Sequence, residues 1–130
     1  MKEPTRPRPT PAELVILRVL WQEGPSTVRD VLQVLQRTRA TGYTTVLKTL
    51  QIMTVKGLVR RDQRERTHVF AAVTPERQML RRIVRDLIDR ACEGSAAKLV
   101  LHALDARRPS EAELKEIRTL LDGFEKSKTP

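Results

Sequence analysis

Residues that start or stop helices divide this chain at short intervals. Gly24-Pro25, Gly57, Gly94 and Pro109-Ser110 each interrupt the sequence, and glycine and proline at such points end helices. Between these interruptions, apolar residues recur three and four positions apart, which is the spacing of amphipathic helices. The pattern predicts a mainly helical protein, built from short helices.

Three helices are predicted before residue 57. Thr10 to Glu13 form a capping box with proline at the first helical position, so the first helix begins at Pro11 and ends before Gly24. Ser26-Thr27 is predicted to open the second helix, which presents Val28, Val31, Leu32 and Leu35 on one face. The third is predicted from about Tyr43 to Lys56, with a buried face that consists of Val46, Leu47, Leu50 and Met53.

The apolar period then changes from helical to strand-like. Residues 58–61 and 67–73 are predicted as two short strands, and residues 63–66 as the turn between them. Three short helices followed by a two-stranded hairpin are typical of a winged helix-turn-helix, predicted for residues 10–74. The predicted fold class is therefore mainly α with a small β-hairpin (α+β). Residues 1–9, rich in proline and charge, are predicted to be a disordered tail.

Basic residues are concentrated in one part of the chain. The 130 residues include 25 Lys and Arg against 16 Asp and Glu, a formal net charge of +9. Residues 36–66 alone contain 8 basic and 2 acidic groups, so this segment has most of the excess. Such a block favours a polyanionic partner, with nucleic acid ahead of an anionic membrane.

The third helix is the predicted DNA-reading element, because a DNA major groove admits one α-helix. The side opposite its apolar face bears short hydroxyls and a lysine, which hydrogen-bond base edges or phosphates and pack on thymine methyls. Tyr43 at the helix start is placed either to touch the sugar-phosphate backbone or to pack the helix end. Two arginines of the hairpin are predicted to reach the flanking backbone or minor groove. The predicted DNA-binding residues are Tyr43, Thr44, Thr45, Lys48, Thr49, Arg64 and Arg66.

Wide apolar stripes mark the second half of the chain, residues 75–125, where three further amphipathic helices are predicted before a tail at 126–130. Stripes this wide, added to an already complete small domain, need a partner surface, and a second copy is the simplest one. The alternative is that these helices fold back on residues 10–73. The predicted dimerisation residues are Leu80, Ile83, Val84, Leu87, Ile88, Leu101, Leu104, Ile117 and Leu121.

Several sequence runs together resemble those of one bacterial regulator family. The most specific run is Tyr43-Thr44-Thr45-Val46-Leu47-Lys48-Thr49-Leu50, followed by Lys56-Gly57-Leu58-Val59. Further runs are Val19-Leu20-Trp21, the opening of the second helix from Ser26 to Val31, and Gly94-Ser95 with Leu99-Val100. On these residues, the chain from about Thr10 to Phe124 resembles the penicillinase-repressor (BlaI/MecI-type) transcriptional regulators.

The resemblance implies a dimeric repressor with an N-terminal winged helix and a C-terminal helical dimerisation region. It also implies a cognate membrane sensor-protease whose activation leads to cleavage of the repressor. The family's cleavage point aligns near His102-Ala103, where the usual Asn-Phe pair is absent. Where relatives have a glycine at the wing tip and Tyr-x-Pro after it, this chain has Glu65 and Phe70-Ala71-Ala72.

The sequence contains little that would indicate a catalytic or metal-binding site. His68 and His102 lie on different predicted elements, and Cys92 is the single cysteine. The sequence lacks a phosphate-binding glycine loop, a nucleophile elbow and paired metal ligands. We therefore expect no enzyme activity, no cofactor and no metal, and we expect a cytoplasmic protein without membrane insertion.

Three functions remain open on the sequence alone. The first is a homodimeric repressor that binds a near-palindromic operator in double-stranded DNA. The second is a winged-helix module for protein–protein contact in a larger assembly, without specific DNA reading. The third is a basic amphipathic protein that binds membranes, which is disfavoured because the apolar stripes lie where charge is balanced.

Overall fold

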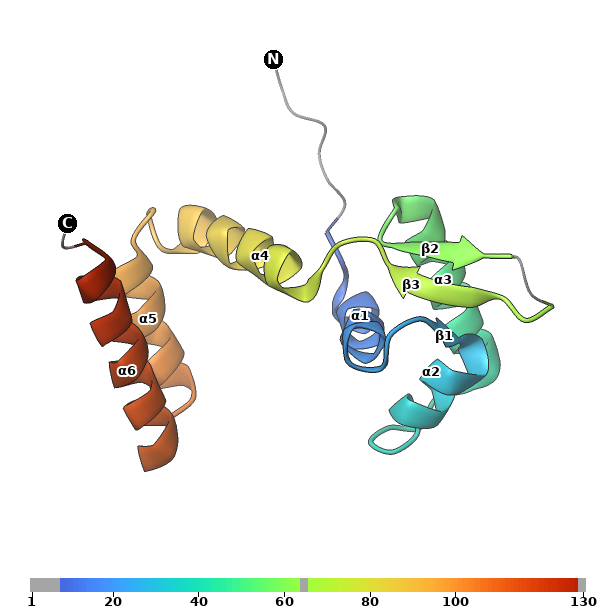
Figure 1. The fold of residues 1–130 in the computed structure, drawn as a ribbon, viewed down its shortest axis with the longest axis horizontal. Helices are drawn as coiled ribbons and strands as arrows, with labels where there is room; N and C mark the ends of the chain where they lie inside the picture. The colour runs from blue at the N-terminus through green and yellow to red at the C-terminus, as the bar shows by residue number, and fades with distance from the viewer. Residues whose placement is uncertain (1–7, 64–65, 129–130) are drawn as a thin grey trace, which may run out of the picture. The chain divides into compact units, whose positions relative to one another are not determined.

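The computed structural model describes residues 8–63 and 66–128 and forms two compact units (Figure 1). One unit ends at Ile83 and the other begins at Val84. The first contains α1 (Pro11–Glu23), β1 (Ser26–Thr27), α2 (Val28–Leu35), α3 (Tyr43–Lys56), β2 (Val59–Asp62) and β3 (Val69–Ala72). Helix α4 (Glu76–Ala91) includes the boundary, and α5 (Ala96–Ala106) and α6 (Glu111–Lys128) follow. The mainly helical α+β fold predicted from the sequence is confirmed.

Capping residues fix where the first two helices begin. The Thr10 hydroxyl accepts a hydrogen bond from the Glu13 backbone N–H (3.2 Å), and the Glu13 carboxylate accepts one from the Thr10 N–H (2.9 Å). Thr27 and Asp30 form the same reciprocal pair at the start of α2, at 3.1 Å in both directions. Both capping boxes satisfy backbone N–H groups that the first helical turn leaves without a partner.

The sheet has three antiparallel strands, in the order β1-β3-β2, where the sequence predicted only the hairpin. In the hairpin, Val59 is paired with Ala72 and Asp62 with Val69. The third strand is Ser26–Thr27, which pairs with Phe70 and Val69 of β3. Thr27 caps α2, as predicted for the opening of this helix, and Ser26 and Thr27 also form a strand that the sequence did not predict.

One hydrophobic core holds the first unit together. Its buried side chains come from α1, α2, α3 and both long strands, and Leu17, Val31, Leu50 and Met53 are fully buried. Phe70 of β3 is the largest of these side chains and is 1% exposed. Removing this aliphatic surface from water is the main force that holds the three helices against the sheet.

The start of α4 belongs to the first unit. Met79 is 1% exposed and is part of the same core, and Ile83 packs against it. Just before the helix, the Trp21 indole N–H donates a hydrogen bond to the Thr74 carbonyl (3.0 Å). The compact unit thus extends to Ile83, about two helical turns past residue 74, where the sequence placed the domain boundary.

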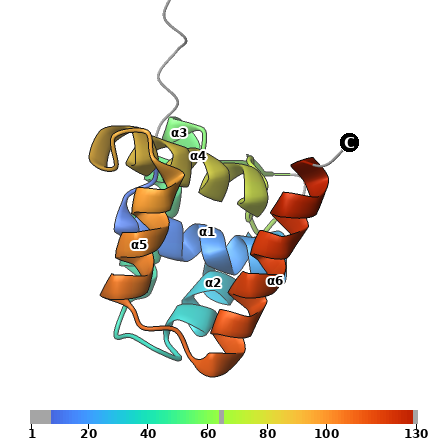
Figure 2. The same cartoon turned by 90° about the vertical axis from the view of Figure 1, so that its left-hand side faces the viewer.

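The second unit is helical and has few buried side chains. Ser95 caps α5 by accepting a hydrogen bond from the Lys98 N–H (3.0 Å), and Ser110 accepts one from the Glu113 N–H (3.1 Å) at the start of α6. Helix α6 continues to Lys128, past the predicted end at residue 125. Figure 2 shows α5 and α6 diverging from the loop that joins them. Among the described residues of this unit, only Cys92 is buried.

Candidate nucleic-acid interface

Helix α3 has one buried face, which fixes how it lies in the first unit. Val46, Leu50 and Met53 are at most 1% exposed and pack in the core. Gly42 precedes the helix without a side-chain cap, and Gly57 ends it with φ +81°, in the left-handed region. Glycine adopts that backbone readily, so the chain can turn directly from α3 into the hairpin. The predicted limits of this helix, Tyr43 and Lys56, are the observed ones.

The opposite face of α3 presents most of the predicted DNA-binding residues to solvent. Thr44, Thr45 and Lys48 are exposed, and Tyr43 at the helix start is 47% exposed. Thr49 differs: it is half-buried, and its hydroxyl donates to the Thr45 carbonyl (2.8 Å). The exposed face of α3 therefore brings together the hydroxyls of Thr44 and Thr45 and the ammonium group of Lys48, while Thr49 lies at the edge of this face.

The hairpin adds cations to the same unit. Arg66 is exposed, whereas the predicted contact Arg64 lies outside the described residues. Arg60 and Arg61 of β2 are also exposed, and the sequence interpretation did not select them. Arg60 and Arg61 lie in the segment that the sequence shows to be rich in basic residues, and this was the signal that could have marked them as candidate DNA contacts.

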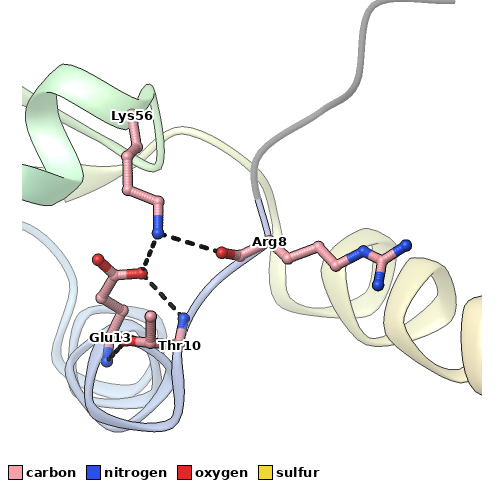
Figure 3. Close-up of polar contacts among 4 residues, drawn as sticks. All are labelled: Arg8, Thr10, Glu13 and Lys56. Atoms are coloured by element: carbon pink, nitrogen blue, oxygen red, sulfur yellow. Dashed lines mark hydrogen bonds and ion pairs between the residues drawn. The ribbon is translucent and has the colours of Figure 1, made fainter.

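A buried carboxylate connects the start of α1 to the end of α3 (Figure 3). Glu13 of α1 is 4% exposed, and its Oε1 lies 2.6 Å from Nζ of Lys56, the last residue of α3. The same ammonium donates to the Arg8 carbonyl (3.2 Å). One lysine thus ties the C-terminal end of α3 to the start of α1 and to the segment that precedes it. The sequence pattern predicts Glu13 as a capping residue but does not predict its ion pair with Lys56.

The environment of Glu13 lowers its pKa below the ordinary value of 4.5. Burial alone raises the pKa, because it disfavours the charged form. The hydrogen bond from Lys56, the Thr10 backbone N–H, the positive charge of Lys56 and the Thr10 hydroxyl together outweigh that effect. The carboxylate is therefore ionised in the folded protein at neutral pH, and the ion pair with Lys56 is complete.

The residues predicted for dimerisation lie at the end of the first unit and in the second unit. Exposed fractions are 41% for Leu80, 41% for Val84, 46% for Leu87, 64% for Leu101 and 54% for Leu121. The remaining predicted residues are half-buried: Ile83, Ile88, Leu104 and Ile117. His102 and Ala103, at the aligned cleavage point, are both exposed on α5.

Comparison with known families decides the assignment of the chain. The model of the penicillinase repressor family matches residues 9–123, which include α1 to α5 and most of α6. The chain belongs to the penicillinase-repressor family. The resemblance predicted from the run at Tyr43–Leu50 is thereby confirmed, and the chain is a winged-helix transcriptional regulator of that family.

Two relatives with which this penicillinase-repressor family member was compared are at most 29% identical to it. It is 29% identical over 103 residues to the transcriptional regulator BlaI of Mycobacterium tuberculosis, covering 78% of this chain and 75% of that one. It is 20% identical over 112 residues to an uncharacterised 16.5 kDa protein of Latilactobacillus sakei, covering 86% and 77% of the two chains.

A solved structure supports the fold. A MarR family protein from Bacillus stearothermophilus is similar with a TM-score of 0.50 and 21% identity, covering 93% of this chain and 76% of that one. At this identity, the likeness is evidence for the winged-helix fold alone. Within the described ranges, none of the helices combines the length and apolar character required to cross a bilayer.

Proposed function

We propose that this regulator is a cytoplasmic homodimeric repressor that recognises a near-palindromic operator in double-stranded DNA. The observation that carries the proposal is the exposed face of α3, where Thr44, Thr45 and Lys48 lie opposite the buried Val46 and Leu50. A helix that buries one side and presents short polar side chains on the other fits a major groove.

Each part of the unit has a role in this proposal. Thr44 and Thr45 lie in the first turn of α3, where free backbone N–H groups and the helix dipole favour a phosphate. Lys48, one turn further, is placed to donate to the acceptor edge of guanine or to a phosphate. Arg66 on the hairpin contacts the flanking backbone, which adds affinity without sequence information.

Dimerisation would bring two such helices onto one operator. Leu87 on α4, Leu101 on α5 and Leu121 on α6 leave apolar surface exposed, and a second copy would cover it. A twofold dimer places its recognition helices about 34–36 Å apart, one turn of DNA, on two half-sites of a near-palindrome.

Release from the operator would follow cleavage by a cognate membrane sensor-protease near His102-Ala103. The exposure of both residues on α5 supports access to this point. Co-expression with the candidate protease and mass spectrometry of the fragments test the step. A cut elsewhere, or an intact chain under inducing conditions, contradicts it.

The decisive experiment measures binding to an operator and to random DNA across salt concentrations. With about six phosphates contacted, the slope of log K against log salt is expected near −5. Lys48→Ala and Thr45→Val should reduce the ratio of specific to random affinity, while Arg66→Ala should weaken both about equally. A flat salt response with no sequence preference would instead favour the protein–protein contact module.

A further inference from the structure

An apolar patch occupies the solvent face of α3, where the fold does not require it. Val55 is 89% exposed and Ile52 is 53% exposed, although both lie on a helix whose buried face is already filled by Leu50 and Met53. Both residues are β-branched, which lowers helix propensity. We refer to Ile52 and Val55 as the α3 apolar patch.

The patch continues the face that bears the polar residues of the proposed interface. At about 100° per residue, Lys48 and Val55 project almost directly away from the buried face, and Ile52 projects between them and Thr45. From Thr44 to Val55, this face is about 16 Å long, because an α-helix rises 1.5 Å per residue. That length matches about five base steps of a DNA strand at 3.4 Å each.

The positive charge of the segment that includes the α3 apolar patch restricts what can cover the patch. Lys48 lies on the same face, and Arg60 and Arg61 are exposed on β2, in the segment where 8 basic residues oppose 2 acidic ones. A second copy of this basic surface would be repelled, whereas a DNA groove attracts it. The apolar group that the major groove offers is the C5-methyl of thymine.

We propose that Ile52 and Val55 read thymine methyl groups in the major groove, so that each half-site requires thymines beyond the bases approached by Thr45 and Lys48. This inference rests on the proposed operator binding and adds the class of base that the C-terminal half of α3 selects. A methyl group placed against an aliphatic side chain is removed from water, and this favours thymine over bases without a methyl.

The test uses the full chain and a duplex that it selects from a random-sequence pool. Each thymine of that duplex is replaced singly by deoxyuridine, which removes the methyl and leaves base pairing intact. At one or two positions per half-site, the replacement should weaken binding about three- to fourfold, as expected for one buried methyl. In Ile52→Ala and Val55→Ala, the same replacement should have no further effect.

Val73→Ala is the matched control, since this valine is 49% exposed in the same unit but lies outside α3. It should retain the full deoxyuridine effect. If a duplex is selected but tolerates every deoxyuridine, the methyl inference is overturned and the proposed function stands. If no sequence is enriched, both fail. If Ile52→Ala changes self-association and leaves the deoxyuridine effect intact, the patch binds protein, and the inference is overturned.

Discussion

The two compact units of this chain use their apolar residues in opposite ways. In the first, helices and strands bury most of their aliphatic side chains in one core, so that Leu17, Leu50 and Met53 have no exposed surface, although Ile52 and Val55 remain exposed. In the described part of the second, Leu101, Leu120 and Phe124 are 62% exposed or more, and only Cys92 is buried. The same kind of amphipathic helix therefore forms a core in the first unit and leaves large apolar side chains exposed in the second.

The largest expected effect comes from truncating the core of the first unit. Leu50→Ala removes a fully buried side chain and should lower the free energy of unfolding by about 2–5 kcal/mol at any protein concentration. Fluorescence of Trp21, the single tryptophan, reports this unit during urea unfolding.

Leu101→Ala is the paired variant in the second unit, where the side chain is 64% exposed. Its effect should be small for the isolated chain and should grow with protein concentration, because it acts through association. A loss as large as that of Leu50→Ala at all concentrations would show that the second unit has a core of its own.

The next effect concerns self-association. Leu87→Asp places a charge on the exposed apolar face of α4 and should raise the dimer dissociation constant at least about 100-fold. Analytical ultracentrifugation measures the change. Leu87→Met keeps the volume and apolar character and should leave the dimer intact. A Leu87→Asp protein that stays dimeric at low micromolar concentration would place the interface elsewhere.

Two glycines should respond to alanine with opposite signs. Gly57 has φ +81°, so alanine there should cost about 1–2 kcal/mol of stability, although no atom lies within 4 Å of the added methyl. Gly123 lies inside α6, also in open space, and alanine there should stabilise that helix by up to about 1 kcal/mol. Thermal unfolding measures both, and a stabilising Gly57→Ala would contradict the left-handed turn.

The smallest expected effect is the part of the stability that depends on Glu13 ionisation. Because the folded state lowers the pKa of Glu13, its contribution is present above pH 4.5 and is lost as the pH falls through the folded pKa. Unfolding of the first unit, followed between pH 6 and pH 3, should show a shallower decline in Glu13→Gln than in the wild type. An identical pH dependence in both proteins would mean that Glu13 and Lys56 are not paired in solution.

Helix α3 shows why much of the fold could be predicted. Glycines stand at both of its ends, and its apolar residues repeat at helical spacing, so local chemistry alone determines its limits. Strand β1 shows the opposite case. Two residues are too few to show a strand period, and Ser26-Thr27 forms a strand because β3, more than forty residues later, pairs with it.

The residues of the candidate site also divide into those that could be predicted from the sequence and those that could not. Exposure of Thr44, Thr45 and Lys48 follows from helical periodicity, so these positions were predictable as a face. The pairing of Glu13 with Lys56 was not, since the two are 43 residues apart and meet only through the packing of α1 on α3. Ile52 and Val55 lie outside the predicted buried face of α3, but single apolar residues are common on protein surfaces and do not by themselves predict a contact.

Thr27 has a consequence for any attempt to build hybrid regulators. Its backbone pairs with Val69 in the sheet, while its hydroxyl and N–H complete the cap of α2 with Asp30. The start of α2 is thereby attached to the wing. If α2 and α3 were exchanged between relatives without β3, the pairing of Thr27 with Val69 would join segments from two different proteins. The smallest segment that keeps this connection intact therefore runs from Ser26 to Ala72, rather than including the two helices alone.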